Sequence, residues 1–139
     1  MNEETIKSIG EKVILGEDFD SAYSHTVAAL KTEGFGVITE VDMQETFKKK
    51  LGAEFPPYKI LGACNPSLSF RALNAVPEVG LLLPCNVTLR QLEDGRVEVA
   101  LIDPFAMLGV LASDDLQPVA EEASARLKRV RAALEKGDF

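Results

Sequence analysis

The clearest hydrophobic pattern lies near the end of the chain. Between residues 115 and 136, apolar side chains recur every three or four positions, as they do on one face of an α-helix. They are Leu116, Val119, Ala120, Ala123, Leu127, Val130 and Leu134. Acidic residues dominate the start of this segment and basic residues its end, which matches the helix dipole. The pattern predicts one long helix that packs on the rest of the protein.

A similar period near the start predicts a helix over residues 18–34. Asp18 can cap its first turn, and Gly34 can end it in the left-handed conformation. Short strands are predicted before and after this helix, over 12–15 and 35–41. In the second strand, one face would carry the alternate residues Phe35, Val37, Thr39 and Val41.

The middle of the chain predicts two short helices with a strand between them. Asp42 is placed to cap the first helix. The apolar run 58–64 is short enough for a buried strand. The pair Asn65-Pro66 offers a cap and a first-turn proline for the second helix, which we expect over 66–75.

Residues 80–92 and 96–103 predict a β-hairpin, and their apolar pattern selects its turn. A two-residue loop would mix buried and exposed side chains on one face, whereas a three-residue loop over 93–95 keeps one face apolar. The predicted cross-strand pairs are Leu89 with Val99, Val87 with Leu101, Cys85 with Asp103 and, on the other face, Arg90 with Glu98. Gly95 would supply the positive φ that this turn needs.

These elements follow the order strand, helix, four strands, helix, with two small helices inserted. The order predicts an α+β fold in which helices cover one face of an antiparallel-rich sheet. The 139 residues suit a single domain, 1–139, with its own core and with the long helix of 115–136 packed on it.

Composition and charge exclude several classes of function. Hydrophobic residues make up 46% of the chain and charged residues 27%, as in an ordinary globular protein. The net charge of -7 argues against a nucleic-acid partner, which would need a basic face. The one basic run, 48–50, is expected to be a solvated helix face. The sequence shows neither a membrane-length apolar run nor a basic-then-apolar leader, so we expect no membrane partner and a cytoplasmic location.

Three segments together resemble a known family. They are Gly34-Phe35-Gly36-Val37, Ile60-Leu61-Gly62-Ala63-Cys64-Asn65-Pro66 and Gly80-Leu81-Leu82-Leu83-Pro84-Cys85-Asn86-Val87, followed later by Asp103-Pro104. From about residue 13 to residue 109, the chain is similar to the "domain of unknown function 302" proteins of bacteria and archaea. The resemblance implies a fold like that of the TATA-box-binding protein and a homodimer. It implies no DNA binding, since a shared scaffold does not transfer a function.

Two Cys-Asn pairs and one aspartate are the candidates for chemistry. Cys64 lies where a strand meets a helix start, which either favours a thiolate or merely places a small buried residue there. Cys85 follows Pro84, and a proline in a strand marks an edge or a bend. In the predicted register Asp103 faces Cys85, so its carboxylate needs a partner, such as an asparagine amide or water. The alternative is that Asp103 caps the segment that starts at Pro104.

Metal and cofactor sites find little support. The two cysteines lack the spacing of a redox pair or a zinc ribbon, and His25 is the only further strong donor. His25 lies off the apolar stripe of its helix and is expected at the surface. No glycine-rich phosphate loop is present in the sequence. We therefore expect no metal and no cofactor.

Three functional hypotheses remain open. The first is a cytosolic, homodimeric small-molecule-binding or accessory protein whose site combines Cys64, Asn65, Cys85, Asn86 and Asp103 at one end of the sheet. The second is an enzyme with Cys64 or Cys85 as a redox or nucleophilic thiol, oriented by Asp103 and the asparagines. In the third, these residues are purely structural, with asparagines tying down loop backbone and cysteines filling space.

Overall fold

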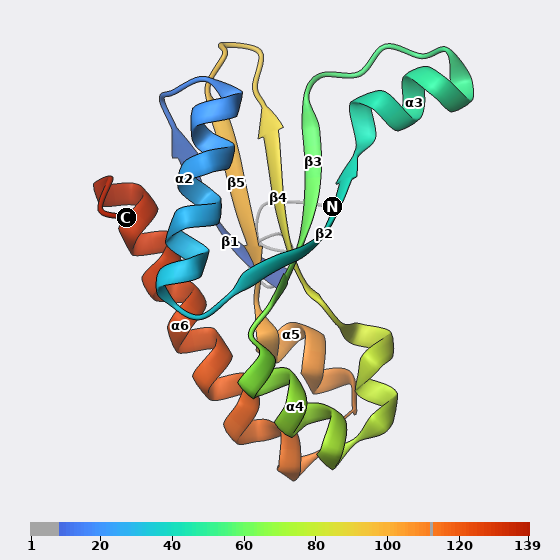
Figure 1. The fold of residues 1–139 in the computed structure, drawn as a ribbon, viewed down its shortest axis with the longest axis vertical. Helices are drawn as coiled ribbons and strands as arrows, with labels where there is room; N and C mark the ends of the chain where they lie inside the picture. Colours follow the sequence, from blue (N-terminus) through green and yellow to red (C-terminus); the bar gives the residue numbers. More distant parts are fainter. Residues whose placement is uncertain (1–8, 112) are drawn as a thin grey trace.

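A computed structural model describes residues 9–111 and 113–139, which form a five-stranded antiparallel sheet and its helices (Figure 1). The strands in chain order are β1 (Gly10–Leu15), β2 (Gly36–Asp42), β3 (Tyr58–Cys64), β4 (Cys85–Gln91) and β5 (Val97–Ile102). Their order across the sheet is β1-β5-β4-β3-β2, and each neighbouring pair is antiparallel. The predicted fold class is confirmed.

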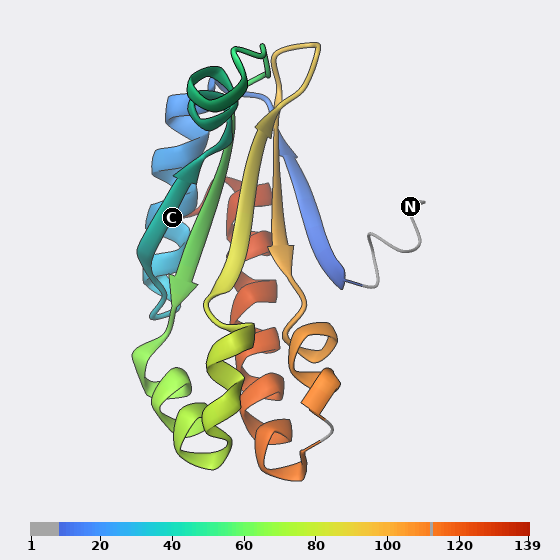
Figure 2. The ribbon, with the colours of Figure 1, turned by 90° about the vertical axis from the view of Figure 1, so that its right-hand side faces the viewer.

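Two long helices, α2 (Phe19–Thr32) and α6 (Gln117–Lys136), cover the same face of the sheet (Figure 2). Every apolar residue of the stripe predicted between 115 and 136 is buried. The helix itself begins at Gln117, because a short 3₁₀ turn, η3 (Asp114–Leu116), precedes it. No helix in the described ranges is long and apolar enough to cross a membrane.

Shorter helices gather at the lower end of the sheet in Figure 1. They are α4 (Pro66–Ala75), η1 (Pro77–Leu82), α5 (Pro104–Leu108) and η2 (Gly109–Leu111). With the first half of α6 they enclose a second apolar cluster, separate from the core between the sheet and the long helices. At the opposite end, α3 (Met43–Leu51) extends away from the body of the protein.

Side-chain caps form where the sequence predicts them. The carboxylate of Asp18 accepts a hydrogen bond from the Ser21 amide at 2.8 Å, and that of Asp42 accepts one from the Glu45 amide at 3.0 Å. Helix α2 ends at Thr32, and Gly34 then adopts a φ of 83°. The predicted boundaries of the strand 58–64 and the helix 66–75 match β3 and α4.

The hairpin register is confirmed over most of its length. Leu89 pairs with Val99 and Val87 with Leu101, and Gly95 has a φ of 87° in the three-residue loop. The last predicted pair is wrong, because the β4–β5 pairing ends at Val87 and Leu101. Cys85 pairs instead with Ala63 of β3.

Two other expectations about strands are wrong. The predicted start at residue 80 fails because 77–82 forms η1, and β4 begins only after Pro84. The simple alternation expected over 35–41 also fails, because the pairing of β2 with β3 shifts between Val37 and Thr39. A β-bulge of this kind moves the following side chains to the opposite face. Glu40 therefore lies on the side of α2, where its carboxylate accepts a hydrogen bond from the Tyr23 hydroxyl at 2.6 Å.

Candidate functional site

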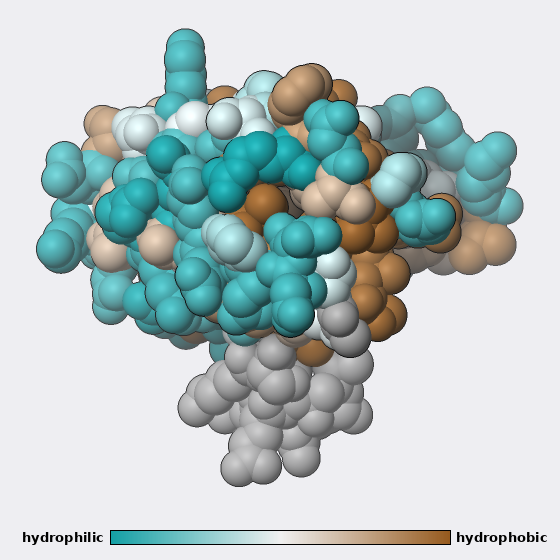
Figure 3. Space-filling view, turned by 90° about the horizontal axis from the view of Figure 1, so that it is seen from below, coloured by the Kyte–Doolittle hydropathy of each residue, from teal (hydrophilic) through white to brown (hydrophobic). Residues whose placement is uncertain are grey.

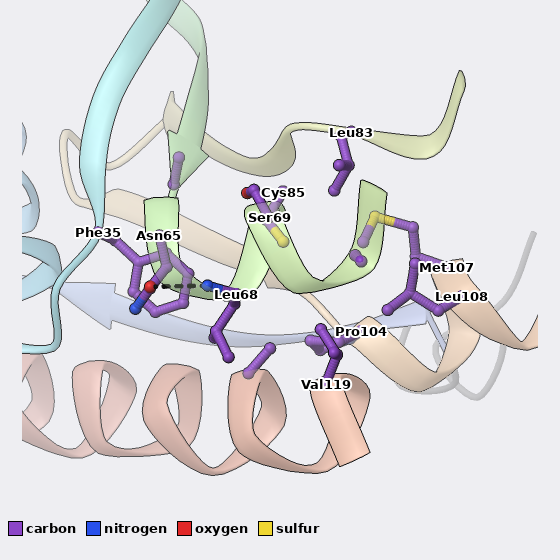
Figure 4. Close-up of a pocket in the computed structure, with 13 residues that line it drawn as sticks. Phe35, Asn65, Leu68, Ser69, Leu83, Cys85, Pro104, Met107, Leu108 and Val119 are labelled. Atoms are coloured by element: carbon purple, nitrogen blue, oxygen red, sulfur yellow. Dashed lines mark hydrogen bonds between the residues drawn. The ribbon is translucent and has the colours of Figure 1, made fainter. Parts of the chain in front are cut away.

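A small cavity lies at the lower end of the sheet, where β3 ends and β4 begins. It has a volume of about 30 Å³ and is enclosed by α4, α5 and α6 (Figure 4). Its walls are mostly apolar, and the polar side chains that reach it are those of Asn65, Ser69 and Cys85. Asn65 and Cys85 are among the candidates that the sequence predicts, whereas Ser69 is not, because no motif marks it.

Asn65 joins two helices across this end of the core. Its side-chain oxygen accepts a hydrogen bond from the Leu68 amide at 3.3 Å, which caps α4, and its amide donates to the Glu33 carbonyl at 3.3 Å. The residue is only 8% exposed. A side chain at Gly34 would begin 2.9 Å from the Asn65 amide nitrogen, so that position needs glycine for space as well as for its positive φ. Asn65 is thus a structural link between α2 and α4.

Cys85 is poorly suited to nucleophilic chemistry. The residue is 7% exposed. Burial raises the pKa of its thiol to about 11, and the charge of nearby Cys64 adds to the shift. Because the thiolate is the reactive form, a thiol with this pKa is almost entirely unreactive at neutral pH.

Cys64 lies next to this cavity without lining it. The residue is half-buried, and its Sγ lies 3.3 Å from the Ser69 hydroxyl oxygen. Both cysteines are free thiols. Their backbones are close, since Cys64 follows the residue that pairs with Cys85, but successive strand residues face opposite sides of a sheet.

Asp103 does not contribute its carboxylate to the cavity. Its oxygen accepts a hydrogen bond from the Phe105 amide at 2.9 Å, so Asp103 is the N-cap of α5. Its own amide donates to the Ile9 carbonyl at 2.8 Å. The expectation of an asparagine partner for this carboxylate is therefore wrong, because Pro104 starts a helix whose first turn supplies the donor. The capping alternative is the one observed.

Asn86 lies on the face of the sheet that the long helices leave uncovered. It lies on β4, pairs with Gly62 of the neighbouring strand β3 and is exposed. The residues predicted as one site are thus divided among the cavity, the first turn of α5 and this open face.

The open face contains a much larger hollow than the cavity. This groove has a volume of about 240 Å³ and runs across β1, β5, β4 and β3. Its lining includes Ile9, Lys12, Tyr58, Asn86, Thr88, Ala100 and Ile102. Of these residues, only Asn86 was predicted from the sequence as a site residue, since residues on the solvent side of a strand give no motif.

The volumes of the two hollows determine what each can hold. Small-molecule sites usually measure ~300–1,000 Å³. The cavity, at about 30 Å³, has room for about one water molecule. The groove, at about 240 Å³, is close to the usual range and is open to solvent.

Other candidate chemistry is limited in the described parts of the chain. No group of three or more histidine, cysteine, aspartate or glutamate side chains there is placed to hold a metal ion. The His25 Nδ1 atom lies 2.7 Å from a Glu17 carboxylate oxygen, and its ring stacks on Phe139. His25 lines neither the cavity nor the groove.

Comparisons with known proteins agree with the family resemblance. The family model described as "Domain of unknown function DUF302" matches residues 11–134. A similar solved structure is the crystal structure of an uncharacterized conserved DUF302 protein from Bacillus stearothermophilus, with a TM-score of 0.81 and 27% sequence identity. The match covers 89% of this chain and 96% of that one. A search of curated proteins gave no match. The chain therefore belongs to the DUF302 family, whose function is unknown.

Proposed function

We propose that this protein is a cytosolic, homodimeric small-molecule-binding domain that uses no catalytic thiol. The observation that supports this proposal most strongly is the groove of about 240 Å³ on the uncovered face of the sheet. Asn86, one of the residues proposed from the sequence, lies at this groove with its amide exposed. Of the residues proposed from the sequence, Asn86 is the one that lines this groove, which supports a role for it in ligand binding.

The other Cys-Asn residues have structural roles under this proposal. Asn65 connects α2 to α4, and Cys85 fills space between the sheet and α4. Asp103 caps α5. These contacts explain why asparagine, cysteine and aspartate occur at these three positions, and the explanation requires no catalytic role. They hold the lower end of the sheet in shape, while the ligand would bind on the other face.

A homodimer would use a different surface, which we call the lower apolar patch. It consists of Phe70 and Leu73 on α4, Leu81 on η1 and Val110 on η2, which are 72%, 42%, 89% and 75% exposed. In the view from below, hydrophobic side chains gather over this region (Figure 3). Large exposed apolar patches commonly mark protein interfaces. A second copy bound here would leave the groove free.

The test of the binding function uses a neutral apolar probe, N-phenyl-1-naphthylamine, whose fluorescence rises in apolar sites. We expect saturable binding to the wild-type protein. Ala100 forms part of the groove floor, so Ala100→Leu should weaken binding at least ten-fold by filling the hollow. Ala125→Leu, at an exposed position of α6, is the matched control and should bind as wild type does. Absent binding, or equal binding by all three proteins, would contradict the proposal.

A further inference from the structure

We propose that the groove on the open face selects small amphipathic anions, with the ammonium group of Lys12 binding the acidic group of the ligand. The ligand class is a flat apolar body with one carboxylate or sulfonate. This inference rests on the proposed binding function and specifies its ligand. It follows from three features of the groove: its shape, its unused hydrogen-bonding groups and its charge.

The shape favours a flat apolar body. The strand register places Lys12, Ala100, Thr88 and Ile60 side by side in one row across β1, β5, β4 and β3. In the middle of this row the side chains are short, so the surface is hollow there. Gly10 adds no side chain to the floor, and a Cβ at this position would lie 2.6 Å from the Leu101 carbonyl oxygen. Longer side chains, those of Tyr58 and Ile102, flank the hollow.

Polar side chains at the groove remain available for a ligand. Within the described residues, the side chains of Tyr58, Asn86 and Thr88 form no hydrogen bond with another protein group. All three can donate hydrogen bonds, and anions accept them. A few polar groups around an apolar floor are typical of small-molecule sites.

The groove has a positively charged side chain, that of Lys12, at its side. Lys12 is half-buried at the groove, and it forms no ion pair with any described residue. Its backbone is held in place, because the guanidinium of Arg131 donates to the Lys12 carbonyl at 3.1 Å. The anchored strand thus presents, at the side of the hollow, an ammonium group that pairs with no carboxylate of residues 9–111 and 113–139.

Among the described residues, Glu11 borders the groove and Glu98 lies on the same face of the sheet, and neither carboxylate opposes a bound anion strongly. Glu98, on the same face, receives two hydrogen bonds of 3.2 Å from Arg90, which neutralises it. Glu11 also borders the groove, but it pairs with the buried residue Leu101, so its side chain lies on the helix-covered side. There it borders a separate hollow together with Lys128.

The test compares two probes that differ by one charged group. N-phenyl-1-naphthylamine is neutral, and 8-anilino-1-naphthalenesulfonate has the same rings with a sulfonate. We expect Lys12→Met, which keeps an apolar stem, to weaken sulfonate binding about five-fold while leaving the Kd of the neutral probe unchanged. Lys31→Met, at an exposed position of α2, is the matched control and should change neither. Raising the salt concentration should weaken sulfonate binding to the wild type only.

The outcomes separate this inference from the function on which it rests. If the neutral probe binds at the groove but Lys12→Met leaves sulfonate binding unchanged, the inference fails and the binding function stands. If neither probe binds the wild-type protein, both fail. If Lys12→Met changes the oligomeric state in sedimentation, a second copy covers this face, and the inference is again overturned.

Discussion

Cys85 and Asn86 are neighbours in the chain, yet they lie on opposite faces of the sheet. Cys85 pairs with Ala63 and is buried under α4, whereas Asn86 pairs with Gly62 and is exposed on the open face. The two residues of the Cys85-Asn86 motif therefore lie in two separate environments. The thiol belongs to the core, and the amide is accessible to a ligand.

The burial of Cys85 predicts very slow alkylation. With a pKa of about 11, its thiol should react with iodoacetamide at pH 7 at least ~100-fold more slowly than a free thiol. Mass spectrometry of the native protein after timed labelling would measure this rate, and denatured protein is the control, in which both cysteines should label quickly. Fast labelling of native Cys85 would revive the enzyme hypothesis.

The same pKa predicts how stability depends on pH. Below about pH 9 the thiol is protonated in both the folded and the unfolded chain, so it causes no pH dependence. Between about pH 9 and about pH 11 only the unfolded chain loses the proton, so the free energy of unfolding falls. The total loss is roughly 2–3 kcal/mol. Urea unfolding should show this loss in the wild type but not in Cys85→Ala; parallel pH profiles for the two proteins would refute it.

The two hydrogen bonds of Asn65 predict a stability cost when the side chain is removed. Asn65→Ala loses the cap of α4 and the bond to the Glu33 carbonyl, which together are worth about 1–3 kcal/mol. Urea unfolding measures the change. Asn74→Ala is the control, since Asn74 is exposed and bonds only within α4, and it should lose less than about 0.5 kcal/mol. Equal losses of unfolding free energy in the two variants would show that the contacts of Asn65 between α2 and α4 add no stability of their own.

The lower apolar patch predicts the effect of a charge on assembly. Leu81→Asp places a carboxylate at the most exposed position of this patch, so the dimer should dissociate, with a Kd at least ten-fold higher. Analytical ultracentrifugation measures the equilibrium. Leu51→Asp tests the specificity of the effect, because Leu51 is 73% exposed on α3, at the other end of the protein. A wild-type monomer, or a dimer that tolerates Leu81→Asp, would contradict this assignment.

Local physics makes much of this fold predictable from the sequence. The stripe ending at Leu134 has a strict helical period, and the caps at Asp18 and Asn65 satisfy amides a few residues away. The hairpin register follows from the alternation of Val87 and Leu89 against Val99 and Leu101. Each of these signals depends on residues close together in the chain or directly across a tight turn.

The candidate site was less predictable than the fold, because it depends on which face of the sheet each side chain lies on. The bulge after Val37 reverses the faces of β2, and only the pairing with β3 shows it. Asp103 was expected at the core, but the start of α5 supplies its partner. The groove is formed by residues from four strands, so no local pattern marks it.

The most direct test of the account is an amide chemical-shift map of the ¹⁵N-labelled protein titrated with N-phenyl-1-naphthylamine. If the ligand binds in the groove, the largest shifts should lie on the open face, at Asn86, Thr88 and Ala100. Shifts concentrated instead around Ser69 and Cys85, with the open face unchanged, would place the ligand in the cavity under α4 and contradict the central claim.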